Sequence, residues 1–465
     1  MKKTFKKLFA LLLSLTVVLA FFAGCDKKVA DKDEDGRTII SVGGWPTKEG
    51  PSLDKMNNRK DAFEKNNPDV KIIPDSFGFD LQTFYSKAAG GQIPDVYGSM
   101  FTEISEIAKS GYAADLTDVL KENGYDNMIN ESILDLITVD GKIYAYPTAA
   151  YLTGLNCNIE LFEEAGLMNP DGTPMQPKTW DEVREFAVKI KEKTGKAGFM
   201  IGTASNIGGF NFTPIAWSFG AKFMEKNSDG KWIATFDSPE TVAALQWVKD
   251  LKWKYDVLPA NAIIDFNEGH KLFGTGQVGM RIRGDSAYLV QYGTDPEMVG
   301  ALAMPAGPKR HVTLLGGSVK YISANSTKDQ IDAALRWIKG ESDYELTDDL
   351  KTNEENTLKE KLANNEHIGT KAFSPWSIDS PVVKFKNELI DKYANANINH
   401  CKPYNDFVAE CNIEIQPEEP MCAQQLYAIL DGCIQSVLTD KNADCALLIK
   451  KAAEDFQKNY LDNVN

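Results

Sequence analysis

The sequence has little of what metal sites and catalytic centres are usually built from. Histidine occurs only four times in 465 residues, at scattered positions (His270, His311, His367 and His400). None of the seven cysteines forms a Cys-x-x-Cys pair, which is the spacing that zinc sites commonly use. The sequence also lacks internal repeats and low-complexity tracts. We therefore expect no metal site and no cofactor.

Apolar residues form only one long run, and it lies at the N-terminus. Four lysines precede the apolar residues 8–22, a run shorter than the roughly 20 residues that a membrane span needs. Two small residues then precede Cys25, which resembles the lipobox of bacterial lipoproteins, although Phe22 stands where Leu or Val is usual. We predict that residues 1–24 are a lipoprotein signal peptide and that Cys25 carries the two acyl chains needed for stable anchoring. The alternative is an uncleaved membrane anchor.

Positive charge is scarce in the rest of the chain. The formal net charge is −15, and it becomes −19 once residues 1–24, with four lysines and no acidic residue, are removed. This balance argues against nucleic acid and anionic membrane surfaces as partners. Residues 25–36 are charged and nearly free of apolar side chains, which predicts a flexible tether. Their aspartates have the spacing of a calcium loop, but Val42 stands where its bidentate Glu is required, so we expect no calcium site.

Six cysteines follow Cys25, and export would permit disulfides among them. They are Cys157, Cys401, Cys411, Cys422, Cys433 and Cys445. Cys422 and Cys433 share a predicted helix, in which their spacing places them about three turns, roughly 16 Å, apart. This separation is too long for a disulfide between those two. All other pairings stay open, and so does the alternative of buried free thiols.

The first third of the mature chain alternates between strand and helix patterns. Residues 38–44 and 70–75 are typical of buried strands, and the helical pattern between them ends before Pro68. Such alternation predicts a largely parallel sheet, whose ligands lie beyond the carboxyl ends of the strands. The loops that begin at Gly43 and Gly98 are therefore candidate ligand loops.

Helical patterns dominate the middle third and the C-terminal tail, and strand patterns return between them. Thr179 and Glu182 form a capping box, and Ser238 with Pro239 starts another helix. The chain is thus predicted to pass twice through each of two α/β lobes, which form a hinged cleft. We predict that lobe 1 comprises residues 37–147 and 280–338, and lobe 2 residues 148–279 and 339–465.

Short motifs over nearly all of the mature chain resemble the extracellular solute-binding proteins of bacterial ABC importers. The similarity is to the sugar-binding group (family 1) that includes maltose-binding protein. It rests on eight motifs in order, AFEKNNPDVKI, GGQIPDVY, SGYAADLT, DGKIYAYP, NIELFEEAGL with PKTWDEV, FDSPETVAALQWVKDL, FGTGQVGM and GGSVKYISANS. The resemblance implies a two-lobed periplasmic-binding-protein-like (type II) α/β fold and no enzymatic activity. It implies a monomer, lipid-anchored to the outer face of the cell membrane, that delivers a carbohydrate, usually an oligosaccharide, to a permease.

The resemblance also implies a ligand site made of aromatic platforms and polar side chains. Sugars present apolar C–H faces between polar edges, so aromatic rings flanked by carboxylate, amide and guanidinium groups suit them. The candidates are Trp45, Ser99, Glu103, Tyr151, Phe210, Asn211, Arg283, Asp285, Tyr288 and Trp376. At Ser286 the family usually has a tryptophan, and we expect Trp376, in a segment longer than in many relatives, to replace it.

Structural roles compete with these assignments. Trp45 follows two glycines and precedes Pro46, so we expect its ring to project from a loop and to contact ligand. Tyr151, Asn211 and Arg283 have the alternative of loop hydrogen bonds or surface ion pairs, and Trp217 has that of core packing. Four further tryptophans lie in amphipathic helices and are expected to pack in the core: Trp180, Trp247, Trp253 and Trp337.

Two other classes of function stay open on the sequence. A surface glycosidase would need two opposed carboxyl groups, and Glu103 with Asp285 is the candidate pair. A binding protein for a peptide, a polyamine or another non-sugar solute is the second alternative. The sequence does not identify the sugar, its linkage, its length or the permease.

Overall fold

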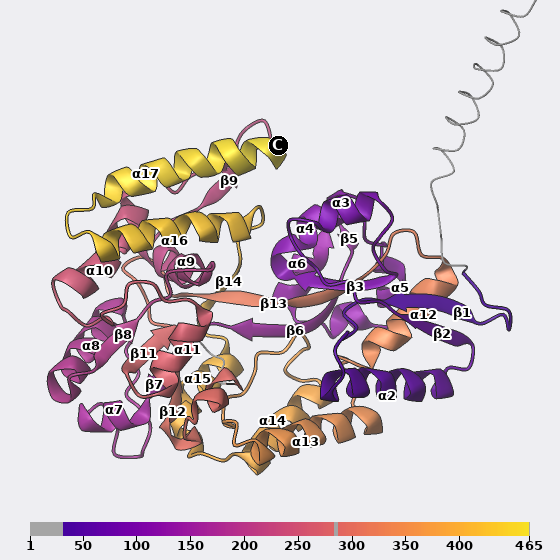
Figure 1. The fold of residues 1–465 in the computed structure, drawn as a ribbon, viewed down its shortest axis with the longest axis horizontal. Coiled ribbons are helices and arrows are strands. Elements are labelled where there is room, and N and C mark those ends of the chain that lie inside the picture. The colour runs from indigo at the N-terminus through magenta and orange to yellow at the C-terminus, as the bar shows by residue number, and fades with distance from the viewer. Residues whose placement is uncertain (1–30, 283–286, 465) are drawn as a thin grey trace, which may run out of the picture. The chain divides into compact units, whose positions relative to one another are not determined.

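The computed structural model describes residues 31–282 and 287–464, in two compact units (Figure 1). The first unit is built from two segments that are far apart in sequence. Its boundaries differ from those predicted for lobe 1. Because compact units need not coincide with lobes, the predicted division into lobes stays a prediction. Of the described residues, the first unit comprises 31–98 and 322–337, and the second comprises 99–282, 287–321 and 338–464.

Parallel strands form the centre of the first unit. β1 (Thr38–Val42) pairs in parallel with β2 (Val70–Pro74) along its whole length, and its last residue also pairs with the start of β3 (Val96–Met100). α2 (Pro51–Asn66) connects β1 to β2, and α3 (Phe84–Ala89) lies between β2 and β3. The predicted alternation of strand and helix is therefore confirmed here, because the apolar strands are buried beneath the helices that connect them.

Residues 31–36 are fixed to the first unit rather than free. Asp33 accepts hydrogen bonds from the backbone N–H and the Nε of Arg37, at 2.9 and 2.7 Å. Lys32 forms an ion pair of 3.1 Å with Asp329 in α12 (Lys328–Lys339). The flexible tether predicted for residues 25–36 stays a prediction, although in this part the charges have partners of opposite sign. The rest of that segment lies outside the described residues.

A four-stranded sheet lies at the core of the second unit. Its strands are buried along their whole length and run in the order β12-β7-β11-β8. β12 pairs antiparallel with β7, whereas the boundary predicted near residue 280 assigned these two strands to different lobes. β12 returns directly alongside β7, and this pairing covers one backbone edge of each strand. The strands are β7 (Leu155–Asn158), β8 (Ala197–Met200), β11 (Val278–Ile282) and β12 (Val299–Leu302).

A longer strand in the same unit carries part of the candidate site. β13 (Val312–Ile322) pairs antiparallel with β6 (Tyr146–Leu152) and parallel with β14 (Glu414–Pro417). The register places Tyr151 directly opposite Gly316. β13 contains two consecutive glycines, so the strand surface opposite β6 is locally bare of side chains.

Helices α9, α10, α16 and α17 pack against one another in the second unit (Figure 1). Ser238 caps α10 through the N–H of Thr241, and Thr179 caps α8 through that of Glu182, as predicted. The Glu182 carboxylate reaches the N–H of Lys178 at 2.7 Å, one residue before the cap. The helices are α8 (Trp180–Thr194), α9 (Ile207–Phe219), α10 (Pro239–Trp253), α16 (Ala423–Thr439) and α17 (Cys445–Phe456).

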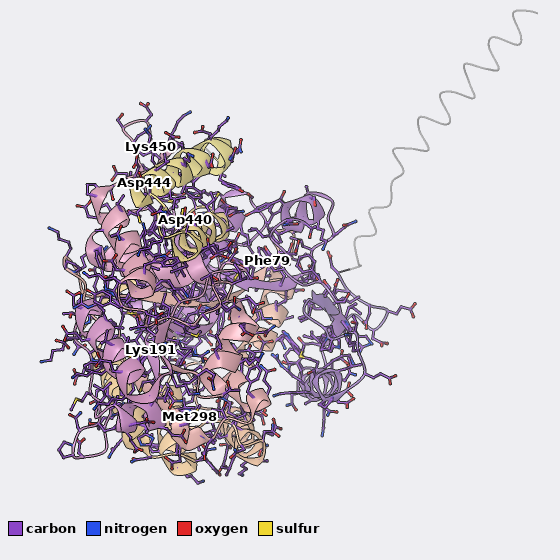
Figure 2. The ribbon with its side chains drawn as sticks, turned by 60° about the vertical axis from the view of Figure 1, so that its left-hand side comes forward. Phe79, Lys191, Met298, Asp440, Asp444 and Lys450 are labelled. Carbon is purple, nitrogen blue, oxygen red and sulfur yellow. The ribbon has the colours of Figure 1, made fainter. Side chains whose placement is uncertain are left out.

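The turn between α16 and α17 carries Asp440 and Asp444, with Lys450 further along α17 (Figure 2). Asp444 caps α17 by accepting a 3.1 Å hydrogen bond from the N–H of Leu447.

The prediction of core packing is confirmed for Trp180, Trp247 and Trp337, which are buried, whereas Trp253 is partly exposed and donates from Nε1 to the Val437 carbonyl. Trp217 also lies in the core, the alternative that competed with a ligand contact.

The remaining helices and strands are short or peripheral. They are η1 (Phe101–Glu103), α4 (Ile104–Lys109), α5 (Thr117–Glu122), η2 (Tyr125–Asn127), α6 (Glu131–Ile137), β4 (Thr138–Val139), β5 (Lys142–Ile143), α7 (Ile159–Glu164), β9 (Met224–Lys226), β10 (Trp232–Ala234), α11 (Phe266–Gly274), η3 (Ala287–Tyr292), η4 (Pro296–Met298), α13 (Asp348–Ala363), α14 (Pro381–Tyr393), η5 (Ile398–Cys401), α15 (Lys402–Glu410), η6 (Gln457–Leu461) and α18 (Asp462–Val464). No helix among the described residues is long and apolar enough to cross a membrane. Within the same residues, the six cysteines after Cys25 are free thiols, and four of them are buried.

Candidate functional site

Tyr151 forms a half-exposed aromatic platform on the sheet of the second unit. Its side chain is 44% exposed, although it is a large ring on a strand whose neighbouring residues are mostly buried. A Cβ built on Gly316 would lie 2.3 Å from both Cζ and Oη of Tyr151, which shows that the ring rests against β13. The glycine therefore provides the space that the ring occupies.

Tyr427 and Phe210 form a second aromatic contact in this unit. Their rings meet edge to face with centroids 6.0 Å apart. The helices that carry them can approach closely because Gly209 has no side chain. A Cβ at this position would lie only 2.3 Å from the Cα of Tyr427. Burial raises the pKa of Tyr427, and Glu418 and Tyr151 are near enough to raise it further. Tyr151, Phe210 and Tyr427 therefore belong to one region of the molecule.

Three carboxyl groups of the second unit have a pKa of about 7. Burial raises the pKa of Glu103, with the nearby Glu106 adding to the rise and the Thr102 hydroxyl opposing it. Burial likewise raises the pKa of Glu418, to which Glu103 contributes, while the Tyr427 hydroxyl donates to its carboxylate at 2.9 Å. Near neutral pH such groups exist in both protonation states, so they can donate or accept hydrogen bonds with a polar ligand.

Glu419 is the third of these groups, and it is held by the core. Trp217 donates from Nε1 to its Oε1 at 2.9 Å, which opposes the rise that burial causes in its pKa, to about 7. The sequence prediction missed Glu418 and Glu419. The signal that could have found them is a pair of acidic residues directly after a strand, at the sheet edge where α/β proteins place ligands.

Two predicted platforms are buried in the structure. Trp45, in the first unit, is only 6% exposed, stacks on Trp337 with centroids 6.1 Å apart and donates from Nε1 to Asn57 at 3.2 Å. Trp376, in the second unit, is 2% exposed, and its Nε1 donates to the Ser342 hydroxyl at 2.9 Å. Neither ring offers a free face here, in contrast to the projecting ring expected for Trp45.

Trp376 belongs to a cluster of rings that joins distant segments of the second unit. Its ring lies 6.0 Å from that of Tyr125 and 5.6 Å from that of Tyr146. Tyr125 in turn donates from its hydroxyl to Asp343 at 3.1 Å. These contacts fix the long segment that contains Trp376 and explain its burial.

Two polar candidates, Ser99 and Asn211, lie within hydrogen-bond distance of other groups of the protein. The Ser99 hydroxyl lies 3.0 Å from the hydroxyl of Tyr321, and both side chains are buried. Asn211 is buried and accepts a 3.1 Å hydrogen bond from the N–H of Gly202, which is the loop role that competed with ligand binding. Their contact with a ligand stays a prediction.

Tyr288 lies in a different aromatic group of the second unit. It is 48% exposed, and its ring makes edge contacts with Phe266 and His270 at 5.1 and 5.4 Å. Arg283 and Asp285 lie outside the described residues. Phe210 and Glu418 thus contact Tyr427, while Tyr151 raises the pKa of Tyr427 and Glu103 that of Glu418. Tyr288 lies in a separate cluster.

Comparison with known proteins assigns the chain to a family. Residues 58–340 match the family described as bacterial extracellular solute-binding protein. The chain belongs to this family. The match covers more than half of the chain, and it confirms the resemblance that the sequence motifs indicated.

The relatives of this solute-binding protein are named for different ligands. The multiple sugar-binding protein of Streptococcus mutans is 23% identical over 358 residues, covering 72% of this chain and 78% of the relative. The sn-glycerol-3-phosphate-binding periplasmic protein of Escherichia coli is 22% identical over 319 residues, covering 65% and 70%. The structure of maltose-bound MalE3 of T. maritima superposes with a TM-score of 0.63 at 22% identity, covering 92% of this chain and 100% of that one. This likeness confirms the predicted two-lobed periplasmic-binding-protein-like α/β fold.

Proposed function

We propose that this extracellular protein captures a carbohydrate, an oligosaccharide, and delivers it to the permease of an ABC importer. The half-exposed ring of Tyr151 on Gly316 carries the proposal. A pyranose ring presents apolar C–H groups that pack on an aromatic face, while its hydroxyl groups need donors and acceptors at the edge. The carboxyl group of Glu418 is near enough to the same aromatic region to supply such an edge.

A thermal-shift screen tests the ligand class. We would compare maltotriose, arabinotriose and chitotriose with sn-glycerol 3-phosphate, spermidine and a tripeptide. A ligand at 100 times its dissociation constant stabilises the folded protein by about 2.7 kcal/mol, which is readily measured as a rise in melting temperature. The proposal requires a shift with at least one sugar, and a shift with spermidine or the tripeptide alone would replace it with a non-sugar function.

We further propose that the protein leaves its ligand intact. The relatives reported above are named as binding proteins, which supports this proposal. A glycosidase would need an acid and a second carboxylate facing each other across the scissile bond. Chromatography of each oligosaccharide after overnight incubation with the protein separates the classes, because hydrolysis products would appear only with an enzyme.

The proposal includes export as a monomeric lipoprotein anchored through Cys25, with no nucleic-acid partner. The extracellular family and the charged N-terminal pattern support it. The ligand contacts predicted from the sequence remain part of the proposal. Of these, Glu103, Tyr151 and Phe210 have the strongest support, because Phe210 contacts the ring of Tyr427, Tyr151 raises the pKa of Tyr427, and Glu103 raises that of Glu418.

A further inference from the structure

Gly316 and Gly317, adjacent in β13, differ in what an added side chain would contact. Paired residues of an antiparallel ladder have their side chains on the same face, so the ring of Tyr151 shares a face with the missing side chain of Gly316. Gly317 faces the other side, where a Cβ would lie 2.4 Å from the carbonyl oxygen of Ala149 and 2.5 Å from Cζ of Phe101. A side chain at Gly317 would therefore collide with the backbone itself.

A side chain at Gly316 would collide with something that can move. Its nearest neighbours are Cζ, Oη and Cε2 at the far end of the Tyr151 ring, at 2.3 to 2.8 Å. Since carbon atoms in contact sit about 3.5 to 4.0 Å apart, the ring would have to shift by about 1 Å or more. The expected change is a shift of the ring rather than of the strand, because the ring is 44% exposed and the atoms met are at the far end of a side chain.

We propose that Gly316 is a positioning residue for ligand binding, because its lack of a side chain lets the end of the Tyr151 ring lie against β13 and so sets the plane on which a sugar stacks. This inference rests on the proposed function. A platform held in one orientation binds more tightly than a freely rotating one, because less side-chain freedom is lost when the ligand arrives. Gly316 thus acts on the ligand only through Tyr151.

The first experiment measures the ring position without any ligand. Purified wild-type protein and the Gly316→Ala variant would be treated with tetranitromethane, and nitration of each tyrosine followed by peptide mass spectrometry. We expect Tyr151 to be nitrated at least twofold faster in Gly316→Ala, whereas Tyr288, equally exposed but in another cluster, reacts at the same rate in both. An unchanged rate at Tyr151 would overturn the inference.

The second experiment is a double-mutant cycle on affinity, with whichever of maltotriose, arabinotriose and chitotriose binds the wild type. Gly316→Ala is expected to weaken binding at least fivefold in the wild type and less than twofold in Tyr151→Ala. An equal loss in both backgrounds would show a merely structural role and overturn the inference. If no sugar binds the wild type, the carbohydrate function fails, and the nitration rates still decide whether Gly316 positions the ring.

Discussion

At the scale of single residues, burial decides the charge state of Glu419. Its carboxyl is almost fully enclosed, and its one hydrogen bond described by the structure comes from the Trp217 indole. Burial raises the pKa of Glu419 from its ordinary 4.5 to about 7, so the folded state holds a proton that the unfolded state releases. Glu419 therefore stabilises the fold fully below pH 4.5, and this contribution falls as the pH rises through 7.

Replacing this carboxyl by an amide should remove the pH dependence that it causes. Glu419→Gln keeps an oxygen for the Trp217 N–H but cannot ionise. Compared with wild type, we expect it to unfold with a similar free energy at pH 4.5 and a higher one at pH 7.5, by up to about 3 kcal/mol. Urea titrations at both pH values measure this, and a variant that gains nothing at pH 7.5 contradicts the assignment.

Trp45 should contribute mainly to the stability of the first unit. Its ring fills the space between Trp337 and the Asn57 side chain, so Trp45→Ala leaves a cavity and is expected to lower the free energy of unfolding by about 3 kcal/mol or more. Trp253→Ala is the matched control, because that ring is partly exposed and should cost less. Intact melting of Trp45→Ala would show that the ring is not a packing element.

At the scale of elements, the contact between α9 and α16 depends on glycine. A Cβ on Gly209 would reach the backbone of Tyr427, whereas a Cβ on Gly432, in the middle of α16, would meet nothing within 4 Å. We expect Gly209→Ala to destabilise the protein by about 2 kcal/mol or more. Gly432→Ala should stabilise it by about 0.5 to 1 kcal/mol, because alanine loses less backbone entropy in a helix.

Thermal unfolding of the two variants under the same conditions checks this pair. The substitutions are chemically identical and differ only in what surrounds the new methyl group. Opposite shifts in melting temperature are expected, downward for Gly209→Ala and upward for Gly432→Ala. Shifts of equal sign would mean that α9 and α16 do not pack as described.

Much of the order of helices and strands could be predicted from local sequence signals. The contacts between distant segments could not. The caps at Thr179 and Ser238 were readable because the hydroxyl and the N–H that it accepts lie within one turn of helix. The pairing of β12 with β7 joins segments over 140 residues apart, and no sequence feature of either strand identifies the other as its partner. The burial of Trp45 and Trp376 was not predictable for the same reason, because the rings that pack against them are remote in sequence or lie outside the motif.

The candidate site was predictable only in part. Tyr151 and Glu103 follow strand patterns at positions where the family resemblance implied contacts. Glu418 had only the weaker signal of an acidic pair directly after a strand, because its place near Tyr427 and Glu103 comes from the fold of the second unit.

At the scale of the whole molecule, export and anchoring are separable from ligand binding. Cys25→Ser removes the thiol that would be lipidated, so we expect the protein to leave the membrane fraction for the culture medium. Its affinity for ligand should not change, since the described ligand candidates all follow residue 37. Cell fractionation with labelled fatty acid measures this, and a membrane-bound variant that still carries label contradicts the lipobox assignment.

Isothermal titration calorimetry of wild type and Tyr151→Ala with maltotriose, arabinotriose and chitotriose tests the central claim most directly. The account predicts saturable one-to-one binding of at least one sugar to the wild type. It also predicts at least a tenfold loss in Tyr151→Ala, about 1.4 kcal/mol, with an unchanged melting temperature. Heat released only by spermidine, a tripeptide or sn-glycerol 3-phosphate would contradict a carbohydrate ligand, and sugar affinity untouched by Tyr151→Ala would contradict the site.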